Sequence, residues 1–196
     1  MSKQEQLNEI REITARADLP LKEGHNMVFG KGNSDAAVMF IGEAPGEKED
    51  LEGVPFVGSA GKQLDKLLAS IGLSIDDVYI ANILKYRPPE NRNPSDDEIR
   101  AHTPYLIEQI KAIKPRVIVT MGNFATKFVM GGFDTEGMKA VGGITALHGK
   151  MGKAVHGSDV FLVMPTYHPA AVLYNSKLRP DIEADFALLK EIIRQG

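Results

Sequence analysis

The stretch DAAVMFIGEAPG, residues 35–46, carries the strongest indication of the fold. Its first part, Ala36–Ile41, is an uninterrupted apolar run, which is typical of a β-strand that is covered on both faces. The run passes directly into Gly42–Gly46, a segment with glycine at both ends and one proline. Glycine and proline at this density predict a loop. We therefore expect a buried parallel strand that ends in a loop.

Three further apolar runs follow, and helical patterns separate the runs from one another. The runs are Val78–Leu84, Arg116–Met121 and Phe161–Met164. Apolar residues three or four positions apart predict helices over residues 3–17, 61–71, 95–113 and 180–194. Ser95 and Glu98 form a capping box at the start of the third helix. Alternating strands and helices predict an α/β fold with three layers, α/β/α, around a central, mainly parallel, four-stranded sheet.

Composition limits the class of protein. The 196 residues predict a single domain, residues 1–196, and 43% hydrophobic with 25% charged residues is ordinary for a globular protein. A net charge of −3 excludes a polycationic coat for nucleic acid but leaves room for a local basic patch. The absence of cysteine excludes disulfides, thiol nucleophiles and clusters that thiolates hold.

The beginning of the chain, MSKQEQLNEIREITARAD, is charged throughout and has no apolar signal core. No apolar run reaches the roughly 18 residues that a membrane span needs. We therefore expect a soluble, intracellular protein of the cytoplasm with no membrane partner, and a chain of this size can act as a monomer.

The residues of unusual chemistry follow the predicted strands. Gly42–Gly46 follows the first strand, Lys85–Pro89 the second and Pro165–Pro169 the fourth. Parallel sheets bind their ligands beyond the carboxyl ends of the strands, so we expect the functional site there. The first loop matches neither of the common glycine patterns that bind phosphate, GxxxxGK[ST] and GxGxxG.

Three side chains at these loops can hold a flat, polar ligand. Phe56 lies in a loop, where its ring either fills the core or stacks on a ligand. Asn82 lies within an apolar run, where its amide either anchors a loop or reads the hydrogen-bonding edge of a ligand. His168 follows the fourth strand and can donate a hydrogen bond to an anion that forms in a reaction. No second metal-binding side chain lies at helical spacing from His168, so we predict no metal site.

Basic residues gather in the loop after the second strand. Lys85, Arg87 and Arg92 stand among prolines, in a loop that either presents charge to a phosphate backbone or is merely solvated. The residues alone leave both interpretations open.

Taken together, four segments resemble the uracil-DNA glycosylase superfamily, and specifically its family 4 branch of bacterial and archaeal enzymes. The segments are GEAPGEKEDLEGVPFVGSAG (residues 42–61), YIANILKYRPPENRNP (79–94), VIVTMGNFA (117–125) and PTYHPAAVL (165–173). They stand in the order of the family at comparable spacing, and the resemblance covers most of the chain. Each motif alone is weakly specific, whereas the four together are highly specific.

The resemblance implies a hydrolase that flips uracil out of DNA and cleaves its N-glycosidic bond, which leaves an abasic site in base excision repair. It implies that Phe56 stacks on the base, that Asn82 hydrogen-bonds the uracil edge and that His168 donates to O2. It also places Gly42 and Ala44 beside the base. Cytosine reverses the donor and acceptor pattern at the edge that Asn82 reads, so a fixed amide would exclude cytosine.

The resemblance leaves several candidates for the attacking water. In the best-known branch of the superfamily an aspartate follows the residue equivalent to Glu43, but here Ala44 stands in that place. We expect Glu43 or Glu49 to position the water, with Asn91 as a further candidate. An anionic carboxylate can also stabilise the cationic sugar of the transition state.

For the DNA itself, the resemblance implies contacts from Lys85, Arg87 and Arg92. It also implies that Leu173, or a neighbour, wedges into the gap that the flipped base leaves. Uracil-containing DNA is therefore the expected partner.

One feature of family 4 is missing. Its members usually hold a four-iron cluster on four cysteines, and the corresponding places here are Ala15, Asp18, Tyr86 and His102. These side chains do not make a thiolate cage, so we predict that the chain binds no cluster and no other cofactor. We expect Tyr86 and other bulky groups to fill the volume and to hold the N-terminal helix to the loop.

Three alternatives remain open at this point. The protein could excise another deaminated base, such as hypoxanthine or xanthine. It could be a module that binds damaged DNA without hydrolysis, which the presence of both Glu43 and His168 disfavours. A small-nucleotide-binding α/β protein would need a phosphate motif, and the sequence contains none.

Overall fold

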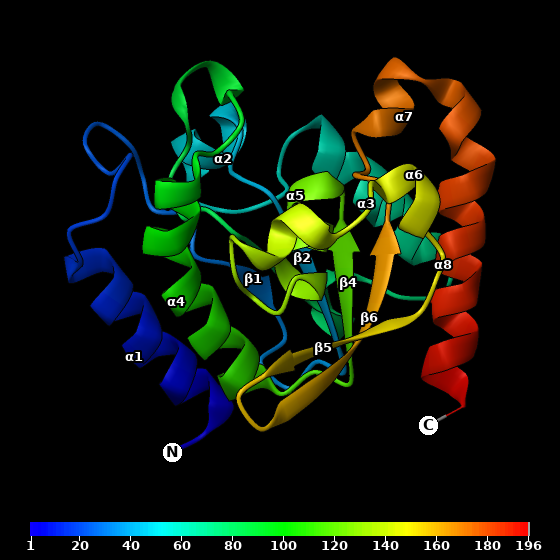
Figure 1. The fold of residues 1–196 in the computed structure, drawn as a ribbon, viewed down its shortest axis with the longest axis horizontal. Coiled ribbons are helices and arrows are strands. Elements are labelled where there is room, and N and C mark those ends of the chain that lie inside the picture. Colours follow the sequence, from blue (N-terminus) through cyan, green and yellow to red (C-terminus); the bar gives the residue numbers. More distant parts are fainter. Residues whose placement is uncertain (196) are drawn as a thin grey trace.

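One β-sheet of six strands forms the centre of the molecule (Figure 1). The computed structural model describes residues 1–195. The strands are β1 (Lys31–Gly32), β2 (Val38–Gly42), β3 (Tyr79–Asn82), β4 (Val117–Met121), β5 (Gly152–His156) and β6 (Asp159–Thr166). Their order in the sheet is β1-β3-β2-β4-β6-β5, in which β3, β2, β4 and β6 are parallel and the two edge strands are antiparallel.

The predicted α/β class with a mainly parallel sheet is confirmed, but the predicted number of four strands is wrong. The four parallel strands are the four apolar runs of the sequence. The two additional strands lie at the edges, where the sequence lacks such a run: β1 has only two residues, and β5 has just one buried residue, Ala154. Apolar runs indicate strands that are covered on both faces, so they do not detect half-exposed edges.

Residues 1–195 also form eight α-helices and four 3₁₀ helices, which lie before, between and after the strands. The α-helices are α1 (Lys3–Arg16), α2 (Glu47–Glu52), α3 (Ser59–Ser70), α4 (Asp96–Ile113), α5 (Asn123–Met130), α6 (Ile144–Leu147), α7 (Ala171–Tyr174) and α8 (Arg179–Arg194). The 3₁₀ helices are η1 (Ile75–Asp77), η2 (Pro89–Asn91), η3 (Gly137–Ala140) and η4 (Ser176–Leu178). None of the helices among these residues is long and apolar enough to cross a membrane.

The four helices that the sequence predicts are confirmed as α1, α3, α4 and α8, with ends that differ by at most two residues. The capping box of α4 is also present, since the Glu98 backbone N–H donates to Ser95 Oγ and the Ser95 N–H donates to the Glu98 carboxylate. This box satisfies backbone donors that a helix start otherwise leaves free.

Helices cover both faces of the sheet, so the molecule has the predicted three layers. Successive residues of β2 face opposite ways: Met39 and Ile41 pack with α1, α4 and α5, whereas Val38 and Phe40 pack with α3 and α8. Figure 1 shows α1 and α4 on one side of the sheet and α8 on the other. Burial of both strand faces explains the uninterrupted apolar runs.

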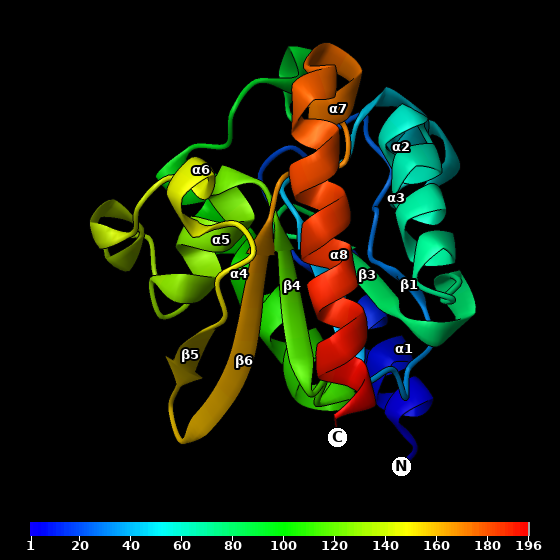
Figure 2. The ribbon, with the colours of Figure 1, turned by 90° about the vertical axis from the view of Figure 1, so that its right-hand side faces the viewer.

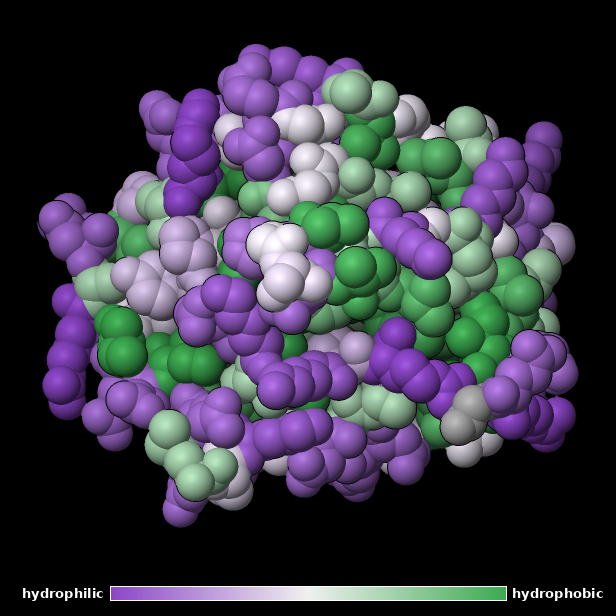
Figure 3. Space-filling model, turned by 60° about the horizontal axis from the view of Figure 1, so that its bottom comes forward, coloured by the Kyte–Doolittle hydropathy of each residue, from purple (hydrophilic) through white to green (hydrophobic). Residues whose placement is uncertain are grey.

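The parallel strands all end at the same edge of the molecule. In Figure 2 this edge is the top, where α2 and α7 lie, and both termini lie at the opposite end. The face that carries the termini shows polar and apolar side chains in small groups, with polar ones along its lower rim (Figure 3). The candidate residues of the sequence follow the strands at the other end, so the fold gathers them there.

Candidate active site

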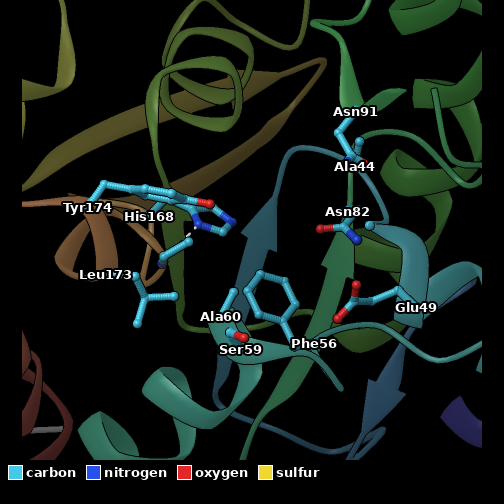
Figure 4. A pocket seen from close by; sticks show the side chains of 12 residues that line it. Ala44, Glu49, Phe56, Ser59, Ala60, Asn82, Asn91, His168, Leu173 and Tyr174 are labelled. Carbon is cyan, nitrogen blue, oxygen red and sulfur yellow. Dashed lines mark hydrogen bonds between the residues drawn. The ribbon is translucent and has the colours of Figure 1, made fainter. Parts of the chain in front are cut away.

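A cavity of about 320 Å³ opens at the carboxyl ends of β2, β3 and β6. Phe56, Asn82 and His168 come from three separate loops or strand ends, and all three line this cavity. Figure 4 shows their side chains pointing toward one shared space. The other lining residues are Ala44, Gly46, Glu49, Ser59, Ala60, Asn91, Ala170, Leu173 and Tyr174.

Phe56 forms one wall of the cavity. Its side chain is buried at 6% exposure, and its backbone has φ of 53°, a left-handed conformation that is uncommon outside glycine. The ring lies 5.7 Å from the His168 ring, centroid to centroid, with 28° between the planes. The Phe56 ring therefore packs in the core and also borders the cavity, and its stacking on a ligand stays a prediction.

Glu49 holds the loop that carries Phe56. Its Oε1 accepts hydrogen bonds from the backbone N–H groups of Val57 at 2.9 Å and Gly58 at 2.7 Å. Lys31 supports the same loop, because its Nζ donates to the Phe56 carbonyl oxygen at 3.0 Å. One carboxylate oxygen of Glu49 is therefore engaged in shaping the loop, while the residue also lines the cavity.

Asn82 is the last residue of β3, and its side chain faces the cavity (Figure 4). It is 2% exposed, and its Oδ1 is a buried side-chain oxygen without a hydrogen-bond partner. An unsatisfied buried acceptor costs about 1–3 kcal/mol, so such an atom needs a physical reason. A ligand that donates to Oδ1 would satisfy it.

Gly42 makes the room that Asn82 and Phe56 need. It ends β2 opposite Asn82, and a Cβ at this position would lie 2.4 Å from Asn82 Oδ1 and 3.0 Å from the Phe56 ring. Any other residue would push against both side chains. Glycine is therefore required here by close approach rather than by backbone conformation.

His168 forms the wall opposite Asn82. Its Nδ1 accepts a hydrogen bond from the Ala170 backbone N–H at 3.2 Å, so the neutral ring carries its proton on Nε2. Burial of the ring lowers the pKa of His168 to about 4, although nearby Glu49 acts in the opposite direction. Gly122 has φ of 87° and a position for Cβ only 3.3 Å from His168 Cβ, which lets the ring approach β4. The imidazole is neutral at neutral pH and has one proton to donate.

A second cavity of about 400 Å³ adjoins the first, and the two share the lining residues Ala44, Gly46, Asn91, His168 and Tyr174. Glu43 lines only this second cavity, and desolvation by burial raises the pKa of its carboxyl. Asn91 has φ of 54° and its Oδ1 accepts a hydrogen bond from Arg87 Nε at 2.9 Å. The candidates for positioning water therefore line the two adjoining cavities: Glu49 the first, Glu43 the second and Asn91 both.

Arg92 lines the second cavity, but its guanidinium is already paired. It makes two hydrogen bonds with the carboxylate of Glu98, and this pair holds the pKa of Glu98 down to about 2. The Arg92 side chain is still 46% exposed, so it can meet a phosphate at its open side. Arg92 thus lies at the rim of the site, whereas Arg87 lines neither cavity and reaches the site only through its hydrogen bond to Asn91.

Lys85 is not available to DNA, and the prediction that it contacts the phosphate backbone is wrong. The residue is 0% exposed, and its Nζ points into the protein, where it donates to the Asn82 carbonyl oxygen at 2.9 Å and to Gln109 Oε1 at 2.6 Å. Basic residues in a loop are usually solvated, and the sequence contains no signal that this one turns inward.

The α7 segment borders the open side of the site. Leu173 is 47% exposed and Tyr174 is 89% exposed, and both line the first cavity. Figure 4 shows Tyr174 extending toward His168. Sequence reasoning singled out Leu173 but missed Tyr174, although an aromatic directly after a candidate wedge is a usable signal.

Ser59 and Ala60 were missed as well, because they are small residues at a helix start. They open α3 beside Phe56, and both line the first cavity. Their positions in the segment GSAG give the only signal in the sequence, since small side chains there leave space next to the ring.

The residues at the places of the cluster cysteines do not fit an iron–sulfur cluster. His102 is fully buried: its Nδ1 accepts from the Lys85 backbone N–H at 2.9 Å, and its Nε2 donates to the Pro20 carbonyl oxygen at 3.0 Å. The buried Tyr86 ring packs edge-on against the His102 ring, with 6.0 Å between the ring centroids. Ala15 and Asp18 are exposed. Both imidazole nitrogens are already used, and no thiolate is present.

Comparison with known proteins adds the family. The model of the uracil-DNA glycosylase superfamily matches residues 29–192. The type-4 uracil-DNA glycosylase of Archaeoglobus fulgidus is 46% identical over 185 residues, which is 93% of this chain and 90% of the relative. The enzyme of the same name from Saccharolobus solfataricus is 48% identical over 86% of this chain and 76% of its own length.

A relative from a further organism carries the same name. The type-4 uracil-DNA glycosylase of Thermotoga maritima is 40% identical over 87% of this chain and 84% of the relative. The similarity includes the segments that carry Phe56, Asn82 and His168, because the match to the family model spans all three. The chain therefore belongs to the uracil-DNA glycosylase superfamily, and within it to the type-4 branch.

Proposed function

We propose that this protein is a monofunctional DNA glycosylase that hydrolyses the N-glycosidic bond of uracil in DNA and leaves an abasic site. The observation that carries the proposal is the cavity in which Phe56, Asn82 and His168 meet. A buried amide oxygen without a partner, a neutral imidazole and an aromatic ring match the edge, the O2 atom and the face of uracil. Membership of the superfamily supports the same reaction.

Asn82 supplies the selection for uracil. Its Oδ1 accepts a hydrogen bond from N3–H of the base, and its Nδ2 donates to O4. Cytosine carries an acceptor at N3 and a donor at N4, so like groups would face each other in the buried site. Leaving buried polar groups unpaired is an effective way to reject a competitor.

His168 stabilises the departing base. When the bond between C1′ and N1 breaks, its electron pair stays on the base, and negative charge develops at O2. The Nε2–H of the neutral imidazole donates to O2, and one such donor contributes about 3–4 kcal/mol to the transition state. Since the ring only shares its proton, the base leaves as an anion.

The sugar becomes cationic in the same step and takes up a water oxygen at C1′. We assign the positioning of this water to Glu43 and Asn91, which line the cavity next to His168. A carboxylate at Glu43 accepts the proton that the water loses and also stabilises the positive sugar. Glu49 contributes through the loop that carries Phe56 and through its charge at the cavity.

The flipped nucleotide requires that the DNA be held and the gap be filled. We assign the contacts with phosphate to Arg87 and Arg92, and the wedge to Leu173 together with Tyr174. We further propose that the protein acts as a monomer, because all parts of the site come from one chain. We also propose that it acts in the cytoplasm. It would do so without a four-iron cluster, because His102 and Tyr86 occupy the place of two of its ligands.

A panel of labelled oligonucleotides tests the proposed function. Each carries U, hypoxanthine, xanthine or T at one position, and alkali cleaves the strand wherever a base has been removed. We expect strand scission with U alone. Scission with hypoxanthine or xanthine but not U would assign another deaminated base, and retention in a gel without scission would reveal a binding module.

A further inference from the structure

Lys85 carries a buried amine that the proposed reaction does not use. Its side chain is fully buried, and among residues 1–195 it takes part in no salt bridge with a carboxylate. The Nζ lies 5.8 Å from the centre of the Phe29 ring. Burial lowers the pKa of this amine to about 7, and a buried polar group of this kind is unfavourable unless hydrogen bonds satisfy it.

Three oxygen atoms from three different segments surround the amine. Nζ donates to the carbonyl oxygen of Asn82 at 2.9 Å and to Gln109 Oε1 at 2.6 Å, and a long contact of 3.5 Å reaches the carbonyl oxygen of Phe29. Three acceptors match the three protons of an ammonium group. The side chain therefore joins the end of β3, the helix α4 and the segment before β1.

The sheet itself leaves a gap at this place. Strand β1 pairs with β3 only through Lys31 opposite Ile80 and Gly32 opposite Tyr79. The same antiparallel register, continued by two residues, would bring Phe29 opposite Asn82. Instead, Lys85 Nζ donates to the Asn82 carbonyl, and Gln109 Nε2 donates to the Phe29 carbonyl at 3.0 Å. The side chains of Lys85 and Gln109 thus replace hydrogen bonds that the backbones of Phe29 and Asn82 would make to each other in a longer pair of strands.

The other side of Asn82 is fixed by the sheet. Asn82 lies opposite Gly42 of β2, and the next residue, Ile83, donates its N–H to the Gly42 carbonyl at 3.0 Å. Lys85 is itself anchored, because its backbone N–H donates to His102 and its carbonyl accepts from the Val28 N–H. The carbonyl of Asn82 is therefore held from the α4 side, while its side chain projects into the cavity.

We propose that Lys85 is a positioning residue for uracil excision, whose amine fixes the end of β3 so that the Asn82 amide faces the base in the reading geometry. Lys85 does not touch the substrate, because the backbone of Asn82 separates its amine from the cavity. A shift of about 1 Å in a positioning group can lower a rate by as much as about a hundredfold. The inference rests on the role of Asn82 proposed above.

A double-mutant cycle distinguishes positioning from general stability. We expect Lys85→Met, which keeps an unbranched side chain one atom shorter than lysine but donates no hydrogen bond, to lower the single-turnover rate of uracil excision at least tenfold. In the Asn82→Ala background the same change should lower the rate less than threefold, because there is no amide left to position. Leu106→Ala is the control: it lies buried in α4 and should lower the melting temperature but leave the rate unchanged below it.

Three results would overturn the proposal. The first is a folded Lys85→Met that excises at the wild-type rate, and the second is an equal loss of rate in both backgrounds. The third is Asn82→Ala at the wild-type rate, which would also remove the proposed role of Asn82. If Lys85→Met does not fold, Gln109→Met is used instead, because it removes the shortest hydrogen bond of the amine. Gln109→Met should then lower the rate of the wild type but not that of Asn82→Ala, and an equal loss in both would overturn the proposal.

Discussion

At the scale of single residues, the site depends on atoms whose donor or acceptor role is fixed. Asn82 Oδ1 is buried without a partner, and His168 Nδ1 is occupied by the Ala170 N–H, which leaves the Nε2 proton free for a ligand. Toward a ligand, Asn82 Oδ1 can therefore only accept a hydrogen bond, and His168 Nε2 can only donate one. Substitutions there should change the reaction far more than they change stability.

Gly42→Ala tests the close approach of the three groups. The added methyl group would lie 2.4 Å from Asn82 Oδ1 and 3.0 Å from the Phe56 ring, so one of them must move. We expect the excision rate to fall by about a hundredfold, which is the usual scale of loss for misplaced groups. Single-turnover kinetics measure the rate, and circular dichroism should show a native fold. An unchanged rate would mean that the cavity has more room than the structure gives it.

His168→Ala removes the donor to O2. The loss of about 3–4 kcal/mol corresponds to an excision rate lowered at least a hundredfold. Burial lowers the pKa of His168 to about 4, so in the wild type this residue should cause no change of rate between about pH 6 and 8. A rate that falls as the pH rises through 6.5 in the wild type, but not in the variant, would show that the protonated ring is the active form.

At the scale of elements, a few side chains tie segments together that the sheet does not join. His102 of α4 bridges the Lys85 N–H after β3 and the Pro20 carbonyl after α1. Each ring nitrogen has one defined role, so only the neutral imidazole fits. Protonation would place a second proton against the Lys85 N–H. The connection is therefore sensitive to acid.

The stability of the protein should record this sensitivity. Burial is the main reason that the pKa of His102 is lowered from 6.5 to about 4. Between these values the unfolded chain binds more protons than the folded one, so the free energy of unfolding falls as the pH falls from 6.5 to 4. The full contribution of His102 is about 3 kcal/mol. Urea unfolding at pH 7, 6 and 5 should show a shallower decrease for His102→Gln, and identical pH dependence in both proteins would refute the bridge.

The elements also show what the sequence can predict and what it cannot. Ala36–Ile41 predicts β2 because burial on both faces demands apolar residues without a break, and Ser95 with Glu98 predicts the start of α4 because capping is local. β5 is half-exposed, and Lys85 is buried only because Phe29 and Asn82 leave a gap that it fills. The pairing of Arg92 with Glu98 likewise depends on how the loop folds back. Long-range contacts of this kind leave no local pattern.

At the scale of the whole molecule, the sheet brings Phe56, Asn82 and His168 together from positions far apart in the chain. Their convergence was predictable because parallel strands end at one edge. The residues at the places of the cluster cysteines were predictable only in part: the lack of cysteine excludes a thiolate cage, but the hydrogen bonds of His102 are visible only in the structure. The fold holds the N-terminal segment by hydrogen bonds and packing at that place.

An iron assay tests this replacement on the intact protein. We expect the purified protein to contain no stoichiometric iron, to lack the broad visible absorption of an iron–sulfur cluster, and to keep its excision activity after mild oxidation. A stoichiometric iron content, with activity that is lost when the metal is removed, would contradict the proposed cluster-free enzyme.

The most direct test of the shared cavity is a crystal structure with duplex DNA that carries 2′-fluoro-2′-deoxyuridine. The fluorine disfavours the cationic sugar, so the base stays attached. We expect the uracil outside the helix, with its ring on Phe56, its O4 and N3–H bonded to Asn82, and its O2 within hydrogen-bond distance of His168 Nε2. A base that remains stacked in the duplex, or binds away from these three side chains, would contradict the account.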